Sequence, residues 1–401
     1  MKKILKMLLL VFFLMIIYVY VLAIEKIPSK ITLFEGEDIN LKTVLGINFN
    51  YADTIETSSS EGTKKNIQVS FFDNIPIKNV DVNVIPKTKV IPLGNIAGVK
   101  LYTNGVLVVG MSEIEGKDNQ RYKPYVNTGI EEGDTIIKVN NKEINSTDDL
   151  IETVNQSEGN KIKINYIHEK ETKECSITPV ETINKEYKIG LWVRDSAAGV
   201  GTITFYEPSN KTFGALGHGI TDIDTNELIN IASGEFITTK ILNITKGEVG
   251  TPGKIQGTID NQKNIGTISK NTKFGIYGKV DNLSSINIDK SKEMDVALRD
   301  EIKQGKATIL CSLDNQTPQE YEIEIEKIFK DNNYDNKSMQ IKVTDERLLN
   351  KTGGIIQGMS GSPIIQNGKF VGAITHVLVN NPQEGYGVFA DIMLKKASEI
   401  E

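Results

Sequence analysis

Two glycine-rich segments carry the side chains that could do covalent chemistry. Residues 214–220 hold His218 between two glycines, and residues 353–364 hold Ser360 in the run Gly-Met-Ser-Gly-Ser-Pro. A serine hydroxyl is a weak nucleophile at neutral pH and needs a general base, usually an imidazole, within hydrogen-bonding reach. The glycines also predict that the backbone N–H groups of Gly358 and Ser360 point into one space, as an oxyanion hole requires. Together the segments predict a nucleophilic Ser360 activated by His218.

The base must come from three histidines, His168, His218 and His376. His168 lies beside Glu169 in a strand-like run and is expected to be a surface histidine. His376 follows the serine on a predicted strand, where it could border the substrate cleft, but a structural role is expected. His218 is therefore the candidate base.

The group that orients the base is usually a carboxylate, and spacing alone leaves its identity open. Asp222 and Asp224 could equally be turn residues. Asp345 ends the predicted strand at residues 341–345 and lies 15 residues before Ser360. The full set of candidates is Asp222, Asp224, Asp260, Asp295 and Asp345.

The elements around these residues predict a mostly β chain. Residues 129–140 read as a glycine turn followed by a strand, and Ser146 with Asp149 forms a capping box that begins a helix. Two further strands follow at 161–167 and 175–179. This order resembles a PDZ domain over residues 91–182. PDZ domains add an extended peptide to a sheet edge beside a glycine-bearing loop, and the resemblance puts that loop at Asn104, Gly105, Val106 and Leu107.

Short β runs fill the rest of the chain. Residues 185–401 predict a sandwich or a pair of barrels, with a short helix at 294–302. Residues 25–90 predict a β spacer or prodomain with strands at 31–34 and 67–72 and a loop tip at 58–62. Residues 1–24 combine lysines with a long apolar run, so they predict a cleaved signal peptide or a retained membrane anchor, and the chain after them is expected to be translocated.

Composition excludes several classes of protein. The chain of 401 residues has 46 basic and 52 acidic residues, a formal charge of −6, which argues against nucleic acid as a partner. Its two cysteines, Cys175 and Cys311, are too few for a disulfide scaffold. No His/Cys cluster has metal-ligand spacing, and we expect no metal and no cofactor.

The chain resembles the stage IV sporulation protein B serine peptidases of endospore-forming bacteria. The resemblance rests on the apolar N-terminus, the PDZ-like block, Gly-His-Gly and Gly-Met-Ser-Gly-Ser-Pro. The resemblance covers nearly the whole chain and is most specific over residues 341–386. It implies a PDZ domain followed by a chymotrypsin-like β-barrel serine endopeptidase. The triad carries over as His218, Asp345 and Ser360, although Asp345 comes late for the chymotrypsin-like order.

The resemblance also implies a cellular role. The enzyme would be secreted into the space between the forespore and mother-cell membranes, process itself near its N-terminus, and cleave a regulator of an intramembrane protease, which releases a late sigma factor. The PDZ domain would bind a substrate, a regulator or the chain's own N-terminal segment. Autocleavage is expected within residues 24–90, in an accessible loop such as 58–65. The alternative is a non-enzymatic PDZ adaptor that binds envelope partners.

Overall fold

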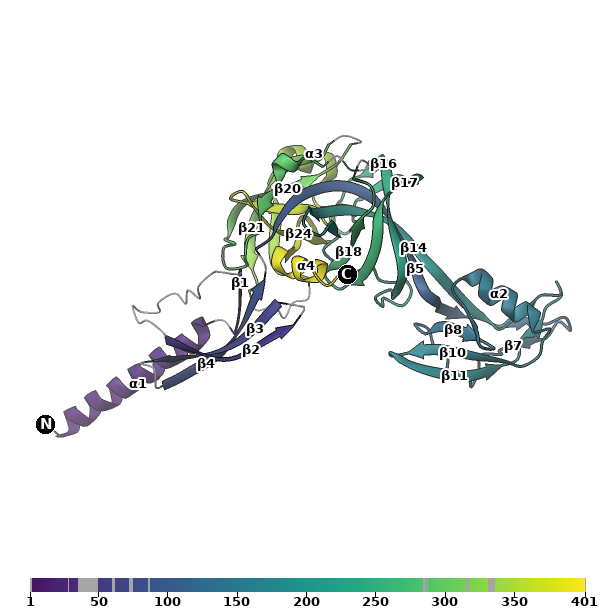
Figure 1. Cartoon of the computed structure of the whole chain (residues 1–401), viewed down its shortest axis with the longest axis horizontal. Helices are drawn as coiled ribbons and strands as arrows, with labels where there is room; N and C mark the ends of the chain where they lie inside the picture. Colours follow the sequence, from purple (N-terminus) through teal and green to yellow (C-terminus); the bar gives the residue numbers. More distant parts are fainter. Residues whose placement is uncertain are drawn as a thin grey trace.

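The computed structural model describes residues 2–27, 29–34, 50–59, 62–71, 75–85, 87–283, 286, 288–314, 317–330 and 336–400. Figure 1 shows a central β body with two attachments, an N-terminal helix with a small sheet on one side and a second, smaller α/β body on the other. The predicted mostly β architecture is confirmed.

The N-terminal attachment begins with the helix α1 (Lys2–Lys26), whose apolar stretch Ile4–Leu22 has a mean hydropathy of 2.7 and is exposed over most of its length, although Tyr20 near its end packs against the sheet that follows. A four-stranded sheet follows in the order β1 (Lys30–Phe34), β4 (Ile75–Ile85), β3 (Gly62–Phe71) and β2 (Asn50–Ser59). The predicted spacer strands fall within β1 and β3. The predicted loop at 58–65 is instead a β2–β3 hairpin, in which Ser59 pairs with Gly62; residues 60 and 61 lie outside the described residues.

The first barrel is a closed ring of six strands. They are, in order, β5 (Lys89–Met111), β14 (Leu191–Glu207), β15 (Thr212–Ala215), β18 (Gly275–Val280), β17 (Lys254–Thr272) and β16 (Ile231–Thr245). β16 returns to pair with β5, for example Phe236 with Val99, and this pairing closes the ring. Large apolar side chains fill it, with Phe213 and Phe236 packed edge to face.

The second barrel is also six-stranded and closed. Its order is β20 (Gly305–Cys311), β21 (Gln319–Ile328), β22 (Met339–Val343), β25 (Asn381–Phe389), β24 (Lys369–Leu378) and β23 (Pro363–Gln366). Helix α3 (Glu346–Thr352) connects β22 to β23, and helix α4 (Ala390–Ala397) follows β25. The predicted helix at 294–302 is absent: after a short 3-10 turn, η2 (Lys290–Lys292), the strand β19 (Met294–Asp295) pairs with β5 instead.

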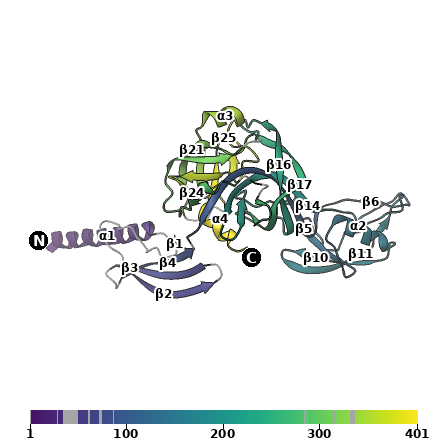
Figure 2. The same ribbon diagram turned by 45° about the horizontal axis from the view of Figure 1, so that its top comes forward.

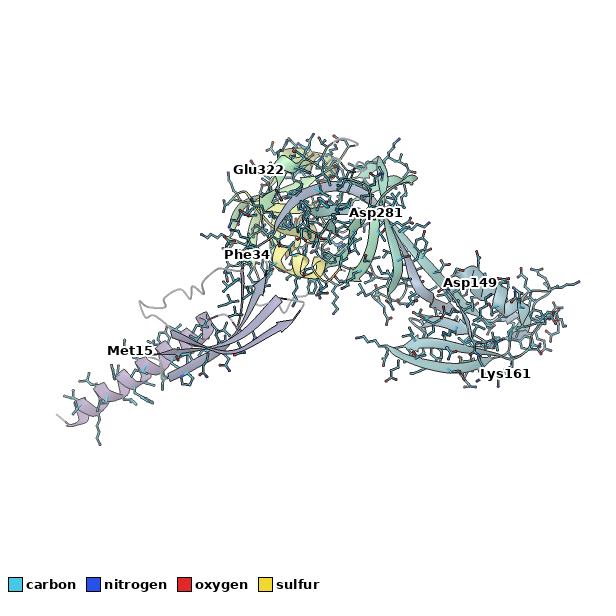
Figure 3. All side chains as sticks on the ribbon, viewed as in Figure 1. Met15, Phe34, Asp149, Lys161, Asp281 and Glu322 are labelled. Carbon is cyan, nitrogen blue, oxygen red and sulfur yellow. The ribbon has the colours of Figure 1, made fainter. Side chains whose placement is uncertain are left out.

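The smaller body has its own apolar core. Its elements are β6 (Ile114–Glu115), β7 (Arg121–Tyr122), β8 (Thr135–Val139), β9 (Lys142–Glu143), α2 (Thr147–Gln156), β10 (Ile162–His168), β11 (Glu171–Ile177), β12 (Val180–Glu181) and β13 (Tyr187–Lys188). The predicted capping box is present, because Ser146 accepts the N–H of Asp149, whose carboxylate accepts the N–H of Ser146. Figure 3 labels Asp149 in this body.

Two long strands, β5 and β14, run from the first barrel into the smaller body (Figures 1 and 2). The first half of β5, including Ile91 and Leu101, fills the barrel, whereas Val106 and Val108 belong to the core of the smaller body. The smaller body is therefore inserted between the first two strands of the barrel. This differs from the predicted boundary at residue 91, because residues 91–103 pair within the barrel.

Candidate active site

The two predicted catalytic segments meet where the barrels adjoin. His218 follows β15 of the first barrel, and Ser360 precedes β23 of the second. Both line one cavity of about 240 Å³. Its other lining residues are Val99, Ala197, Ala198, Gly199, Val200, Leu216, Ile220, Gln357 and Gly358. The structure thus brings together the predicted nucleophile, the predicted base and one predicted oxyanion donor.

His218 is held in the tautomer that a general base needs. Its Nδ1 lies 2.8 Å from the carbonyl oxygen of Gly219. A carbonyl can only accept, so Nδ1 carries the proton and Nε2 keeps its lone pair. Burial lowers the pKa of His218 below 6.5, and the Gly219 carbonyl opposes this only in part. The imidazole is therefore neutral and basic at pH 7.

The serine loop is fixed against the first barrel. The backbone N–H of Thr202 on β14 donates to the carbonyl of Ser360 at 3.1 Å, and its hydroxyl donates to the carbonyl of Gly358 at 2.7 Å. Gly361 has φ of +97°, and a Cβ there would lie 2.2 Å from the Thr202 carbonyl oxygen. Glycine is therefore required at this position, because a side chain has neither the conformation nor the space.

Both predicted oxyanion donors are free. Within the described residues, the backbone N–H groups of Gly358 and Ser360 donate to no protein acceptor. The Ser360 hydroxyl itself donates to the carbonyl of Thr375 at 2.9 Å and does not bond to His218. A rotation of the serine side chain toward His218 is needed before it can attack.

In the structure Asp345 contacts Arg347 and Glu322 rather than His218. Its Oδ1 accepts the N–H of Arg347 at 2.9 Å and caps α3, while the Arg347 guanidinium lies 2.7 Å from Oδ2. The N–H of Glu322, labelled in Figure 3, also donates to Oδ2 at 3.2 Å. Hydrogen bonding from Arg347 holds the pKa of Asp345 at about 2. The carboxylate is ionised and fully engaged.

The strand register explains why Asp345 and His218 do not meet. Gln340 on β22 pairs with Tyr386, which pairs with His376. Asp345 lies five residues beyond Gln340 and two residues past the end of β22, where it begins α3 as its N-cap. The structure does not bring Asp345 to His218, and no carboxylate among the described residues bonds to His218.

The other candidate carboxylates have contacts or positions that do not involve His218. Asp222 and Asp224 both pair with Arg194, in the loop that follows His218. Asp295 lies in β19, and the side chain of Asp260 is outside the described residues.

His376, which the sequence predicts on a strand that could border the substrate cleft, lies directly beside His218. The two imidazole rings lie 5.2 Å apart between centroids. Burial, and then the nearby His218 and Lys337, lower the pKa of His376 to about 4. It is therefore neutral beside the base. His168, expected at the surface, is instead mostly buried, with Nδ1 2.8 Å from the Asp134 carboxylate.

The predicted peptide-binding loop of the smaller body has no free edge. Leu107 pairs with Arg194 of β14 on one side and with Thr135 of β8 on the other, and Val106 pairs with Ile136. A Cβ at Gly105 would lie 2.5 Å from the carbonyl oxygen of Ile136. Asn104–Leu107 therefore cannot accept an added strand.

A second glycine turn in the smaller body, formed by Lys188-Ile189-Gly190-Leu191, was not predicted from the sequence. Gly190 has φ of +79°, and the backbone N–H groups of Ile189 and Gly190 donate to no acceptor within the described residues. The turn follows β13 and begins β14, whose start pairs with β5. The signal that could have found it is a glycine between two apolar residues at the start of a strand.

Two six-stranded barrels that meet at a histidine and a serine loop, with a PDZ domain inserted in the first, define a serine peptidase of the chymotrypsin-like class. Residues 185–394, just over half of the chain, match the SpoIVB peptidase S55 family, and residues 103–178 match the PDZ domain family. The chain belongs to the SpoIVB peptidase S55 family and is a serine peptidase with a PDZ domain. The sporulation family that the sequence resembles is thus confirmed.

No match was found among curated proteins. Among solved structures, the PDZ domain of the SdrC-like protein from Listeria monocytogenes is 22% identical, covers 22% of this chain and 87% of that one, and has a TM-score of 0.18. The inactive form of the Rv3671c protease is 12% identical over 49% of this chain and 83% of that one, with a TM-score of 0.27. A serine-to-alanine mutant of Rv3671c from M. tuberculosis is 11% identical over 50% and 82%, also with 0.27.

Proposed function

We propose that Ser360 and His218 form the catalytic pair of this peptidase. The observation that carries the proposal is their shared cavity, in which Nε2 of His218 is the available base. Ser360 leaves the Thr375 carbonyl, gives its proton to Nε2 and attacks the peptide carbonyl. The protonated imidazole then gives that proton to the leaving amine, and water hydrolyses the acyl-enzyme by the reverse sequence.

The backbone N–H groups of Gly358 and Ser360 stabilise the oxyanion of each tetrahedral intermediate. The carbonyl of Gly219 orients His218, the task that a carboxylate has in the usual triad. Asp345 acts through the fold, because it caps the helix that leads into the serine loop. The predicted triad with Asp345 remains the competing assignment, and substitution at that position separates the two.

The enzyme works outside the cytoplasm, between the forespore and mother-cell membranes. The apolar α1 supports membrane association or secretion. Its substrates are its own residues 24–90 and a protein that regulates an intramembrane protease, whose cleavage leads to release of a late sigma factor. Membership of the sporulation family supports this role. The PDZ domain recruits a peptide ligand for the same cleavage.

The test is labelling and processing of four full-length forms: wild type, Ser360→Ala, His218→Ala and His168→Ala. A fluorophosphonate probe should label the wild type and His168→Ala, and only these should lose N-terminal residues. His168→Ala is the matched control, because it removes an imidazole far from the cavity. Equal labelling and processing of all four would refute the assignment of Ser360 and His218, and absence of both from all four would favour a non-enzymatic adaptor.

A further inference from the structure

Within the part of the chain that the structure describes, β14 has an open edge that joins the PDZ domain to the catalytic cavity. From Leu191 to Val200 every residue is exposed or half-buried, whereas the remaining residues of the strand are buried. β5 pairs with one side of this stretch, and β15 pairs with the other side only from Ile203 onward. At its far end, Ala197–Val200 line the cavity that holds His218 and Ser360. An extended peptide can therefore add along this edge.

The start of β14, at Leu191, lies beside helix α2, and PDZ domains hold peptides between such a strand and helix. Tyr187 donates its N–H to the side chain of Asn155 in the last turn of α2, and Asp195 accepts the N–H of Thr147 in the first turn. The start of β14 thus runs antiparallel to α2, with the Ile189–Gly190 turn at the C-terminal end of the helix.

The face of α2 toward β14 carries an unpartnered apolar side chain. Thr147, Ile151 and Asn155 are spaced four apart and lie on one face of the helix. The first and last of them contact the segment 187–195, but Ile151 is 53% exposed. On the facing strand, Leu191 and Val193 point toward the same side, where they pack against the apolar core that α2 covers and stay partly exposed. An apolar side chain of a bound peptide would be covered here.

The turn at the start of β14 suits a carboxylate. The N–H groups of Ile189 and Gly190 are free, and the left-handed Gly190 lets consecutive N–H groups converge on one anion. Lys188 directly precedes them in the chain; its half-exposed side chain pairs with Glu186 at 3.0 Å and can bring a positive charge to this turn. A free C-terminus is the anion that an extended peptide presents at this point.

The direction of the bound peptide and the length of the open edge of β14 then determine where the peptide is cut. A peptide that pairs antiparallel with β14 and ends at Gly190 runs back toward Val200, so its N-terminal part reaches Ser360. Leu191–Val200 is ten residues, roughly 33 Å at 3.3 Å per residue. We infer that, for protein substrates other than its own N-terminal segment, the enzyme holds the free C-terminus of an extended tail at the PDZ domain and cuts about ten residues before it. This inference rests on the proposed catalytic role of Ser360.

The test uses full-length enzyme in detergent and a peptide pool made by digesting a bacterial proteome, with half of the pool amidated at its C-termini. Mass spectrometry gives the number of residues between each cut and the C-terminus. We expect cuts 8–12 residues from the C-terminus to be enriched at least fivefold over a random distribution. Amidation should reduce these cuts about tenfold, since it removes a charge-assisted contact.

Two charge reversals complete the test. Lys188→Glu should remove the positional preference while probe labelling of Ser360 persists, and Lys170→Glu, an exposed lysine in the β10–β11 turn, should change neither. Cuts spread evenly along free and amidated peptides, with Ser360 still labelled, would overturn the fixed distance alone. Absence of both cutting and labelling would overturn the assignment of Ser360 and this inference with it.

Discussion

Substitution of Asp345 separates a helix cap from a catalytic carboxylate. Asn is as good an N-cap as Asp, so Asp345→Asn keeps the bond to the N–H of Arg347 but loses the charge that the guanidinium binds. A carboxylate that orients a catalytic histidine loses roughly 10⁴ in kcat on the same change. If Asp345 acts only through the fold, kcat/KM of the variant should stay within about threefold of wild type.

The magnitude of the stability change follows from the pKa of Asp345. A carboxyl whose pKa falls from 3.8 to about 2 contributes at most about 2.5 kcal/mol to the free energy of unfolding. Because the Arg347 side chain is 64% exposed, solvent screening reduces this to about 1–2 kcal/mol. The folded-state pKa is depressed, so this stability is present above pH 3.8 and disappears as the pH falls toward 2.

The assay is urea unfolding at pH 7 and pH 3, with kcat/KM measured on the same preparations. Asp345→Asn should lose about 1–2 kcal/mol at pH 7 and clearly less at pH 3. Asp345→Ala should lose about 1 kcal/mol more, since the cap is also removed. Asp300→Asn, at an exposed ion pair with Lys330, is the control and should change little. A folded Asp345→Asn enzyme with kcat reduced a thousandfold or more would refute the reasoning and restore the triad.

Three further outcomes follow from the same structure. Because burial lowers the pKa of His218 and protonation removes the base, the acid limb of the kcat/KM profile should fall below pH 6.5; a limb above pH 7 would contradict this. Gly361→Ala should abolish activity through its clash with β14, whereas Gly368→Ala, with open space around its Cβ position, should retain it in the same peptide assay. Asp391→Ala leaves the buried Arg299 unpaired and should cost about 3–5 kcal/mol in urea unfolding; a loss below 1 kcal/mol would show that the pair is dispensable.

The sequence predictions that agree with the structure depend on interactions between residues close together in the chain. The capping box of Ser146 and Asp149 needs only residues three apart, and the structure forms it. The glycines around Ser360 were predicted to shape a loop with free N–H groups, and Gly358 and Gly361 do adopt positive φ. In each case the hydrogen bonds and steric limits involved lie within a few residues of one another, so the sequence contains them.

Asp345 shows where such reasoning stops. A strand end was expected to aim its side chain at His218, but the direction depends on the register of β22 against β25, which no local pattern encodes. A local signal for the contact that the structure shows did exist. An aspartate directly before a helical segment, with its side chain accepting the N–H two residues on, is an N-cap.

For a related reason, the predicted peptide-binding loop Asn104–Leu107 differs from the turn that we infer. Asn104-Gly105 and Ile189-Gly190 both read as a glycine turn before an apolar strand. Long-range strand pairing decides which of the two turns begins a strand with a free edge. Leu107 pairs with a strand on each side, whereas Leu191 pairs with a strand on one side only. A sequence window around either glycine holds no information about that difference.

The insertion of the PDZ domain was also hidden from the sequence. β5 is mostly apolar and buried from Val90 to Val108, with a few polar residues between, and the break at Asn104-Gly105 reads as a turn rather than as a strand that changes partners. β16 and β14 flank its first half, and β14 and β8 flank its second. Both connections between the bodies are thus strands that pair with each other. Backbone hydrogen bonds, rather than a flexible linker, set the distance from the PDZ turn to Ser360, and a fixed distance between a bound C-terminus and the cut requires this rigidity.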